Sequence, residues 1–427
     1  MKKVLIITYY WPPAGGPGVQ RWLKFVKYLR DFEIEPVVYV PENPSYPILD
    51  ESLNSEVPSN IKILKQKIFE PYSIAGIFSR KQTQTISSGI IEAEEEQTAL
   101  QKALLFIRGN FFIPDARKFW IKPSVKFLKK ELEKQNYEAI ITTGPPHSLH
   151  LIGLQLKEQT RVKWIADFRD PWTRIGYHKK LKLTSSSQAR HQKLEKKVLT
   201  SANHIITTSY TTREEFQNKT SKPVSLITNG FDISVNDRSQ KKENFEISHI
   251  GSLLAGRNPC ILWQSLAEII KTDDDFKSHF RLRLAGRISE EVLSELQQHE
   301  LMPFVVNEGY VNHSRAVEMQ RQASILLLIE IDSEETRGII PGKIFEYLAA
   351  KNPILAIGPE NWDAAKIIRE TKSGEVFNYN DRKELENYIR EQFEYFKKGN
   401  SGLNSIGISS FHRRELTGQL AQLIHSL

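Results

Sequence analysis

The sequence lacks the features that define several large classes of protein. Its 427 residues contain a single cysteine, Cys260, which excludes an intramolecular disulfide and a zinc site built from cysteines. No stretch approaches the ~18 apolar residues of a membrane-spanning helix. The motifs GxxxxGK[ST], HExxH and GxSxG are also absent, so three common phosphate-binding and hydrolytic signatures are missing. We expect a cytoplasmic protein, because a lone cysteine fits a reducing compartment.

The length and the charge of the chain narrow the alternatives further. A chain of 427 residues is long for one core and suits two domains. Its net charge of +8 favours anionic partners such as nucleotides or anionic lipid. The basic residues are dispersed and no RNA- or DNA-reading motif is present, so we expect no nucleic-acid partner. The apolar run 4–8 is too short for a signal peptide and reads as a buried first strand.

The first half of the chain alternates between apolar runs and helical patterns. A strand at 3–8 leads into a glycine-containing loop at 9–20, which is how a Rossmann-like domain begins, although GxGxxG is absent. Further strands are predicted at 36–40, 138–143, 162–166, 204–208 and 224–228. An insertion at about 68–135 interrupts this rhythm, and its polar part, 80–98, is expected to be mobile.

A second alternating series follows a polar linker. Strands are predicted at 246–250, 281–285, 303–308, 324–329 and 353–357, and the helices between them at 260–271, 289–298, 313–322, 341–350 and 361–370. Strict alternation implies parallel sheets with right-handed crossovers. The predicted fold is therefore α/β, with two Rossmann-like doubly wound domains facing a central cleft. The boundaries are 1–232 for the first domain, 233–244 for the linker, 245–410 for the second domain, and 411–427 for a terminal helix that returns to the first.

Residues 103–130 combine Phe and Trp with seven Lys or Arg. Such a segment can rest on an anionic membrane surface or hold a lipid-linked substrate. The competing interpretation, which we favour at this stage, is a helical insertion whose aromatic residues pack inward. The sequence thus leaves open a peripheral contact with the inner face of a membrane.

The stretch 338–350, GIIPGKIFEYLAA, predicts a helix that begins near Pro341. Backbone N–H groups at such a helix start attract phosphate. Lys343 and Glu346 are three residues apart and are expected to share a face, where the carboxylate could accept hydrogen bonds from sugar hydroxyls. An ordinary helix with solvated charges is the alternative.

Three other loops that follow predicted strands carry candidate functional residues. Ligands of doubly wound sheets bind at the carboxyl ends of strands. The candidates are Asp167, Arg169 and Asp170 in DFRDPW, His147 in GPPHS, and Gly251, Ser252 and Arg257 in GSLLAGRNP. The alternatives are a structural ion pair in DFRDPW and a surface arginine at 257. The acidic run that contains Asp273 and Asp275 is interpreted as a solvated loop.

Taken in order, these motifs resemble the GT-B glycosyltransferases, and among them family 4, whose members are retaining enzymes that use sugar nucleotides. The GGPG loop looks like the acceptor-side glycine loop of that family, and VSLITNGFD (224–232) resembles its exit to the second domain. GSLLAGRNP is similar to its phosphate-binding loop. LRLAGR, VNEGYV and GKIFEYLAAKNPILA then follow the family's order.

The resemblance implies a role for each matching residue. It places the donor nucleotide on the second domain. Glu346 would then contact the ribose, and backbone groups together with Arg257 and Lys343 would contact the diphosphate. The full donor set is Gly251, Ser252, Arg257, Gly338, Ile339, Ile340, Gly342, Lys343 and Glu346. The acceptor-side set is Gly15, Gly16, Gly18 and Gln20, and the catalytic set is His147, Asp167, Arg169 and Asp170. Gly338 departs from the family, which has its first glutamate at this position; Glu334 and Glu335 are nearby.

The activity implied by the resemblance is transfer of a sugar from a UDP- or GDP-linked donor to a glycan or lipid-linked acceptor. Such an enzyme would retain the anomeric configuration, need neither metal nor cofactor, and act in bacterial surface polysaccharide or cell-envelope glycan biosynthesis. Two other classes share the expected fold: a sugar-nucleotide epimerase or hydrolase, and a non-catalytic protein that binds glycans or nucleotides.

Overall fold

The computed structural model describes residues 1–69, 99–174, 181–232 and 242–427. The chain divides into two compact units, which are described separately below. Unit 1 comprises Met1–Asn229 together with Arg413–Leu427, and unit 2 comprises Gly230–His412. The segment 80–98 and most of the predicted linker, 233–241, lie outside the described residues.

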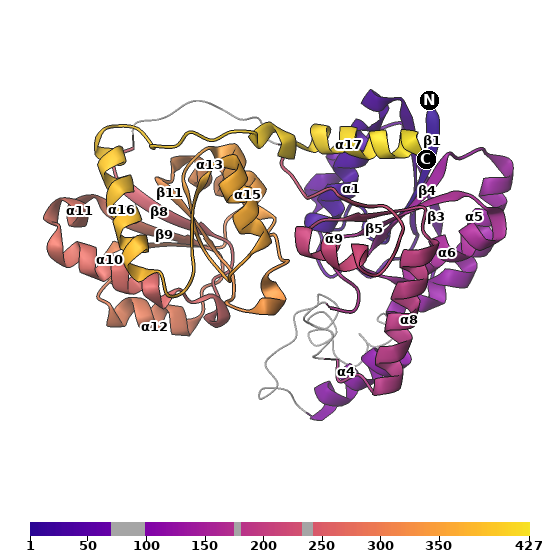
Figure 1. The fold of residues 1–427 in the computed structure, drawn as a ribbon, viewed down its shortest axis with the longest axis horizontal. Helices are drawn as coiled ribbons and strands as arrows, with labels where there is room; N and C mark the ends of the chain where they lie inside the picture. Colours follow the sequence, from indigo (N-terminus) through magenta and orange to yellow (C-terminus); the bar gives the residue numbers. More distant parts are fainter. Residues whose placement is uncertain (70–98, 175–180, 233–241) are drawn as a thin grey trace. The chain divides into compact units, whose positions relative to one another are not determined.

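Unit 1 is built on a seven-stranded parallel sheet, in the order β3-β2-β1-β4-β5-β6-β7 (Figure 1). Its strands are β1 (Lys2–Ile7), β2 (Ile34–Pro41), β3 (Lys62–Gln66), β4 (Ala139–Gly144), β5 (Lys163–Phe168), β6 (His204–Thr207) and β7 (Val224–Leu226). The order reverses direction between β1 and β4. The central strands are buried on both faces, because helices cover a parallel sheet on each side.

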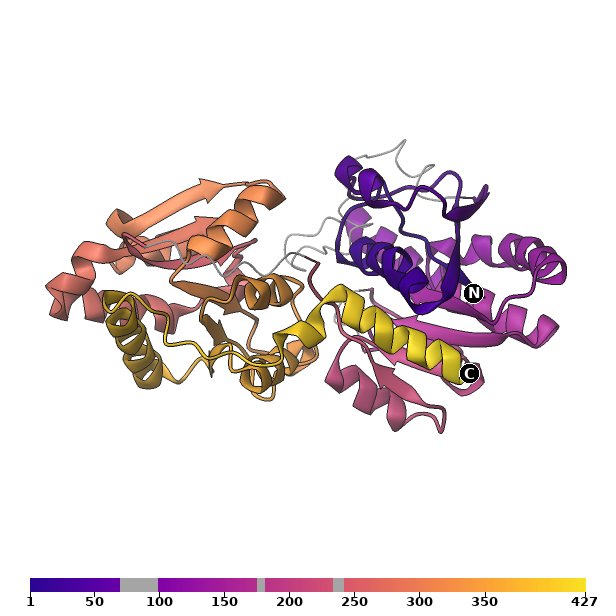
Figure 2. The same cartoon turned by 90° about the horizontal axis from the view of Figure 1, so that it is seen from above.

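The helices of unit 1 include one from the end of the chain. They are α1 (Pro17–Tyr28), α4 (Ala99–Phe111), α5 (Ile121–Lys134), α6 (Ser148–Thr160), α8 (Ser185–Ser201), α9 (Tyr210–Gln217) and α17 (Arg413–Ser426). Helix α17 lies beside α1 in both views (Figures 1 and 2). The Arg414 guanidinium pairs with Asp31 at 2.9 Å, and Leu420 and Ile424 are buried in the same cluster as Val26. The last helix therefore completes the core of the first unit.

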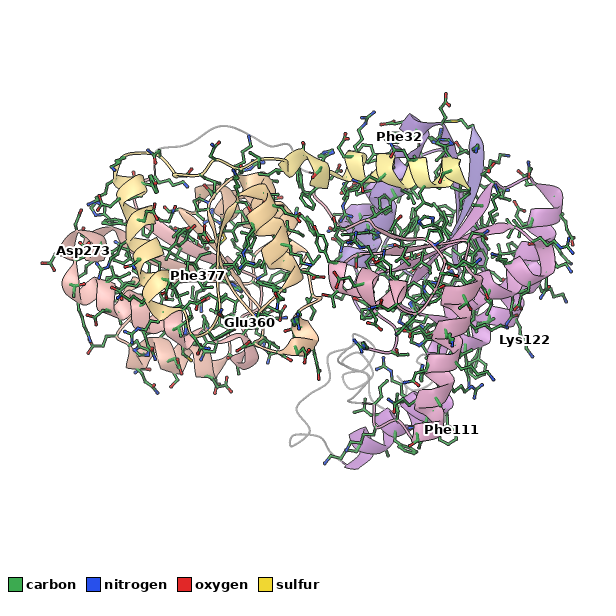
Figure 3. The ribbon with its side chains drawn as sticks, viewed as in Figure 1. Phe32, Phe111, Lys122, Asp273, Glu360 and Phe377 are labelled. Atoms are coloured by element: carbon green, nitrogen blue, oxygen red, sulfur yellow. The ribbon has the colours of Figure 1, made fainter. Side chains whose placement is uncertain are left out.

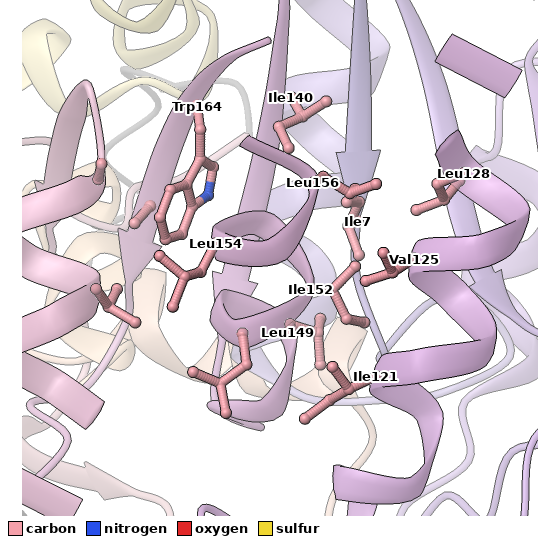
Figure 4. Packing of buried hydrophobic residues seen from close by; sticks show 14 of the residues in the cluster. Ile7, Ile121, Val125, Leu128, Ile140, Leu149, Ile152, Leu154, Leu156 and Trp164 are labelled. Atoms are coloured by element: carbon pink, nitrogen blue, oxygen red, sulfur yellow. The ribbon is translucent and has the colours of Figure 1, made fainter. Parts of the chain in front are cut away.

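The largest apolar cluster of unit 1 fills the space between the sheet and the pair α5 and α6 (Figure 4). Ile152 and Leu156 of α6 pack toward Ile7 of β1, and Val125 and Leu128 of α5 close the far side. The α5 positions recur at the three-residue and four-residue spacing of an amphipathic helix. This packing fixes the strand ends from which the functional loops leave.

Unit 2 has a six-stranded parallel sheet, in the order β10-β9-β8-β11-β12-β13. Its strands are β8 (Phe245–Ile250), β9 (Phe280–Ala285), β10 (Val305–Gly309), β11 (Ile325–Ile329), β12 (Ile354–Ile357) and β13 (Gly374–Phe377). Its α-helices are α10 (Cys260–Thr272), α11 (Asp274–His279), α12 (Glu290–Gln298), α13 (His313–Gln322), α14 (Lys343–Ala350), α15 (Asp363–Thr371) and α16 (Arg382–Lys397). The order reverses between β8 and β11, the kind of position at which doubly wound sheets bind ligands.

Two local expectations are corrected by the structure of unit 2. The acidic run after α10 is not a loop but the start of α11, because the Asp273 carboxylate accepts a hydrogen bond from the Phe276 amide at 2.9 Å and caps the helix. Helix α14 begins at Lys343 rather than at Pro341. Pro341 and Gly342 form the turn that precedes the helix, with their carbonyls accepting from Ile344 and Phe345.

Candidate functional site

A lysine and a histidine meet at the point where the sheet of unit 2 reverses its order. Lys343 opens α14, and its Nζ lies 3.3 Å from Nε2 of His249, which is on β8. The other ring nitrogen of His249, Nδ1, faces the Leu327 carbonyl at 3.1 Å and must donate to it. Nε2 of a neutral imidazole is then an acceptor, so the Lys343 ammonium donates to it. The histidine thus holds the lysine at the carboxyl edge of the sheet.

Gly251 makes room for this lysine. The residue directly follows β8 and has a φ of +123°, which L side chains rarely adopt. A Cβ atom at this position would lie 3.2 Å from Lys343 Nζ. The glycine therefore serves two purposes, a backbone turn and a close approach between the loop and the cation.

Arg257 forms the second cationic group of this edge, and it is paired with Glu330, which is not among the predicted site residues. The residue ends a short 3₁₀ helix, Ala255–Arg257, and its Nε and Nη2 donate to the two carboxylate oxygens of Glu330 at 3.0 and 3.2 Å. Glu330 directly follows β11. Its side chain is 1% exposed, whereas that of Arg257 is 34% exposed. The guanidinium is fixed on one side and open to solvent on the other.

Burial shapes the charges in this cluster. It lowers the pKa of Lys343 to about 7, with the nearby Arg257 guanidinium acting in the same direction and Glu330 opposing it. Burial also lowers the pKa of His249 well below its ordinary value, with Lys343 and Arg257 contributing. Lys343 thus carries its charge with little solvent and beside a second cation, Arg257, an arrangement that a bound anion relieves.

Glu346 lies one turn into α14 and points to a different neighbour. Its Oε2 accepts from Nε2 of the buried Gln320 at 2.8 Å, and its Oε1 lies 3.2 Å from Nε2 of His313. Both partners belong to α13. Lys343 and Glu346, which were expected to share a face, have different partners: the lysine reaches β8, and the carboxylate is held against α13.

The remaining predicted donor residues lie in the loops around this cluster. Ser252 follows Gly251, and Gly338, Ile339, Ile340 and Gly342 lie between the 3₁₀ turn Glu334–Thr336 and α14. Trp362 holds this loop in place, because it donates its indole N–H to the Ile339 carbonyl at 2.6 Å. Glu334 pairs with Arg337 at 3.5 Å with its own side chain well exposed.

In unit 1 Asp167 has its carboxylate enclosed by donors from its own unit. Its carboxylate accepts from Arg21 Nη2 at 2.9 Å, from Trp22 Nε1 at 2.9 Å and from Thr143 Oγ1 at 2.8 Å, with Arg21 Nε at 3.4 Å. Both Asp167 and Arg21 are fully buried. A carboxylate that has no exposed surface and several donors cannot contact a substrate, so Asp167 is a structural residue that ties β5 to α1.

His147, another residue of the predicted catalytic set, is buried as well. Its imidazole is buried and lies parallel to the Trp172 ring, with centroids 4.8 Å apart. The nearby His150 is also buried, its Nδ1 2.9 Å from Thr142 Oγ1, and burial lowers its pKa to about 3. Both rings are thus buried among aromatic side chains, His147 against Trp172 and His150 against Phe168.

Arg169 lies against the glycine of the first turn of α1. A Cβ atom at Gly18 would overlap Nη1 of Arg169, so only glycine allows the guanidinium to lie over the first turn of α1. Arg169 Nη2 donates to the Pro145 carbonyl, and its guanidinium lies 5.9 Å from the centre of the Tyr10 ring. Gly15, Gly16 and Gln20 lie in the loop that leads into α1 and in the helix itself.

The next residue, Asp170, follows in the same loop. Burial raises the pKa of its carboxyl, and the charge of Arg169 opposes that effect. Arg169 and Asp170 are only partly buried, unlike Asp167. Of the four residues in the predicted catalytic set, these two retain access to a ligand.

Four residues that shape these sites were missed from sequence. Glu330 could have been found, because it directly follows β11, and ligands of doubly wound sheets bind at the carboxyl ends of strands. His249 is a polar residue inside an apolar strand, which is a weaker signal. Arg21 and Gln320 lie on helices among polar neighbours, and nothing in their spacing marks them.

Comparison with known proteins identifies the architecture. No family model matches the chain, and no curated protein matches its sequence. Among solved structures, HepE from Anabaena in complex with UDP and glucose matches with a TM-score of 0.59 at 15% identity, over 100% of both chains. The lipopolysaccharide outer core galactosyltransferase WaaB matches with a TM-score of 0.57 at 12% identity, over 100% of this chain and 99% of that one.

A third similar structure is sucrose-phosphate synthase from Thermosynechococcus elongatus, with a TM-score of 0.56 at 14% identity, over 100% of this chain and 99% of the other. Similarity at these identities establishes the fold alone. The two parallel sheets, of seven and six strands, are the two Rossmann-like domains of that fold. The chain has the GT-B fold.

Proposed function

We propose that this chain is a glycosyltransferase that moves a sugar from a nucleotide diphosphate donor to a glycan or lipid-linked acceptor. The observation that carries the proposal is the pair of cationic groups, Lys343 and Arg257, held at the carboxyl edge where the sheet of unit 2 reverses its order. An anion of two linked phosphates has the charge to satisfy both. The GT-B fold and the UDP and glucose bound in HepE support this interpretation.

The donor would be bound through three kinds of contact. Lys343 and Arg257 would hold the diphosphate, assisted by backbone N–H groups of the loop 338–342 and of Gly251 and Ser252. Glu346 would accept hydrogen bonds from the ribose hydroxyls, since its carboxylate is held in place by Gln320 and a carboxylate oxygen can accept more than one hydrogen bond. UDP and GDP are the nucleotides to test first.

The same cations would assist the chemistry. As the bond between sugar and phosphate breaks, negative charge grows on the leaving diphosphate, and fixed positive groups stabilise it. We therefore expect transfer to proceed in the presence of EDTA. By the resemblance to family 4, the sugar would keep its anomeric configuration, which NMR of the product would show.

Unit 1 would contribute the acceptor side. Arg169 lies over Gly18 at the start of α1, and Asp170 follows it. We propose that these two side chains orient the acceptor or the sugar, with Gly15, Gly16 and Gln20 forming the adjacent loop. Asp167 and His147 have no direct part in this proposal, because both are buried.

The test is nucleotide binding followed by turnover. Binding of UDP and GDP is measured by calorimetry for the wild type and for Glu346→Ala, and equal affinities would remove the proposed donor site. Turnover of a panel of sugar nucleotides is then measured with and without acceptor. Free sugar or an epimerised donor formed without acceptor would instead indicate a hydrolase or an epimerase. Binding without any turnover would indicate a non-catalytic protein.

We also propose that α4 rests on an anionic membrane surface. The large apolar residues of the insertion differ in exposure: Trp120 of the following segment is buried, whereas Phe106, Ile107 and Phe111 of α4 are exposed, Phe111 by 64%. Figure 3 shows Phe111 at the end of α4 and Lys122 at the start of α5, both at the surface. No described helix is long and apolar enough to cross a bilayer.

Sedimentation with lipid vesicles tests this contact. Each phenylalanine that enters the interface contributes about 1.5–3 kcal/mol, and each adjacent lysine about 1 kcal/mol on anionic lipid. We expect binding to phosphatidylglycerol vesicles, weak binding to phosphatidylcholine vesicles, and loss of binding in the double variant Phe106→Ser/Phe111→Ser. Ile48→Ser, at another exposed apolar residue of unit 1, is the matched control. Equal sedimentation of all three proteins would contradict the proposal.

A further inference from the structure

Glu330 poses a problem for the anion site in which it lies. Its carboxylate directly follows β11 and is almost completely buried next to Arg257 and within range of Lys343. A negative charge at this place repels the diphosphate that the two cations are proposed to bind. Its presence therefore needs a physical reason.

The contacts of Glu330 suggest that reason. Its two oxygens accept from Nε and Nη2 of Arg257, and Oε1 also accepts from the Ile331 amide at 2.9 Å. The backbone is fixed as well, because the Tyr379 hydroxyl donates to the Glu330 carbonyl at 2.8 Å. The carboxylate is thus a rigid support on which the guanidinium is held by two parallel hydrogen bonds.

This arrangement leaves part of the guanidinium available. Arginine has five N–H donors, and the fork to Glu330 engages Nε and one N–H of Nη2. The side chain is one-third exposed, so its open edge can receive a ligand. A long, flexible side chain that is already ordered loses less conformational freedom when it binds an anion.

We infer that Glu330 is a positioning residue: it holds the Arg257 guanidinium in the orientation from which it meets the donor diphosphate, and this gain outweighs the repulsion from its own charge. The inference rests on the proposed function. Glu330 also acts on the second cation of the site, because its charge raises the pKa of Lys343 against the effects of burial and of Arg257.

The direction in which Glu330→Gln changes the affinity for UDP tests the inference. If Glu330 contributed only charge, Glu330→Gln would remove a repulsion and tighten UDP binding. If Glu330 positions Arg257, the same change weakens UDP binding, and we expect a rise in Kd of about fivefold or more. Glu246→Gln is the matched control, because Glu246 is also a buried glutamate paired with an arginine, Arg283 at 2.8 Å, but lies at the amino end of β8.

The same substitution made in an Arg257→Ala variant separates a positioning role of Glu330 from a general structural role. In Arg257→Ala there is no guanidinium to hold, so adding Glu330→Gln is expected to leave UDP affinity unchanged or to improve it. Weakening in both backgrounds would overturn the inference. The pH profile gives a further readout: Glu330→Gln should shift the loss of UDP affinity to lower pH, since Lys343, which faces His249, Arg257 and Glu330, loses its proton more readily.

The outcomes distinguish this inference from the proposal on which it depends. If the wild type binds neither UDP nor GDP, the donor site itself is wrong. If Arg257→Ala weakens binding and Glu330→Gln does not, only the positioning role fails. Should Glu330→Gln not fold, Glu330→Asp keeps the charge but withdraws the carboxylate by one methylene, and is expected to weaken UDP binding; unchanged affinity there would also overturn the inference.

Discussion

The two units of this protein each place an arginine–carboxylate pair near the carboxyl edge of a parallel sheet. In unit 1 the pair is Arg21 with Asp167, and both side chains are fully buried. In unit 2 it is Arg257 with Glu330, where the carboxylate is buried but the guanidinium is one-third exposed. The residue types are nearly the same, and the difference lies in how much of the arginine reaches solvent.

This difference separates a structural pair from the pair that we propose binds the donor. Arg21 uses its third nitrogen on the Thr228 carbonyl at 2.7 Å, and Asp167 is saturated by Trp22 and Thr143. Nothing remains for a ligand. Arg257 has one edge fixed and one edge open, which is the arrangement a ligand site requires. An ion pair at a strand end therefore indicates function only when its cation is accessible.

The largest expected effect is on stability, from Arg21→Ala. Removal of this guanidinium leaves the Asp167 carboxylate buried without its charge partner, which typically costs about 3–5 kcal/mol. Urea denaturation followed by tryptophan fluorescence measures the loss, and Trp22 reports on it directly because it donates to the same carboxylate. UDP affinity is expected to be unchanged, since the donor residues belong to unit 2.

Arg257→Ala is the matched variant in the other unit. It is expected to reduce stability less than Arg21→Ala, because water can reach the space that the exposed guanidinium leaves. It should raise the Kd for UDP by about 10- to 100-fold, corresponding to a charge-assisted hydrogen bond of about 1.5–3 kcal/mol. If Arg257→Ala instead unfolded the protein and Arg21→Ala impaired binding, the distinction drawn here would be reversed.

A smaller change in the affinity for UDP is expected when the pH is raised, because Lys343 loses its proton. Its pKa is about 7 in the free protein, and a bound diphosphate would raise that pKa by stabilising the ammonium. Binding above pH 7 then takes up a proton, so the affinity for UDP should fall as pH rises from 7 to 9, by at most tenfold per unit. Lys343→Met should bind more weakly and show a flat profile. A wild-type affinity that does not change over this range would contradict the assignment.

Much of the fold could be predicted from the sequence because strands and helices differ in apolar periodicity. The continuous apolar run LLLI predicts the buried strand β11. The three-residue and four-residue spacing of Ile344, Phe345 and Leu348 predicts the helix α14. The errors occurred where a side chain decided the local structure. Asp273 caps a helix in a stretch that composition alone assigns to a loop.

The site was predicted less completely, because its partners are distant in sequence. Lys343 and Arg257 could be selected from their positions at loop ends, and the resemblance to a family supported both. Their partners could not be selected, since Lys343 and His249 are 94 residues apart and Arg257 and Glu330 are 73 apart. Burial also cannot be predicted from a motif. In DFRDPW the Asp167 carboxylate is buried and accepts several hydrogen bonds, whereas Asp170 is only partly buried.

The smallest expected effect on UDP binding comes from the residue that supports Glu346, which can be compared with the residue that supports Asp167. Gln320 supports Glu346 as Trp22 supports Asp167, through one buried N–H donor. If Glu346 holds the ribose, Gln320→Leu should let its carboxylate move and weaken UDP binding about threefold to fivefold, the effect of one modest hydrogen bond. The 2′,3′-dideoxy analogue of UDP, which has no ribose hydroxyls, should bind wild type and variant equally. An equal loss for both nucleotides would mean that Gln320 supports the fold of α13 and α14 and not the recognition of the ribose.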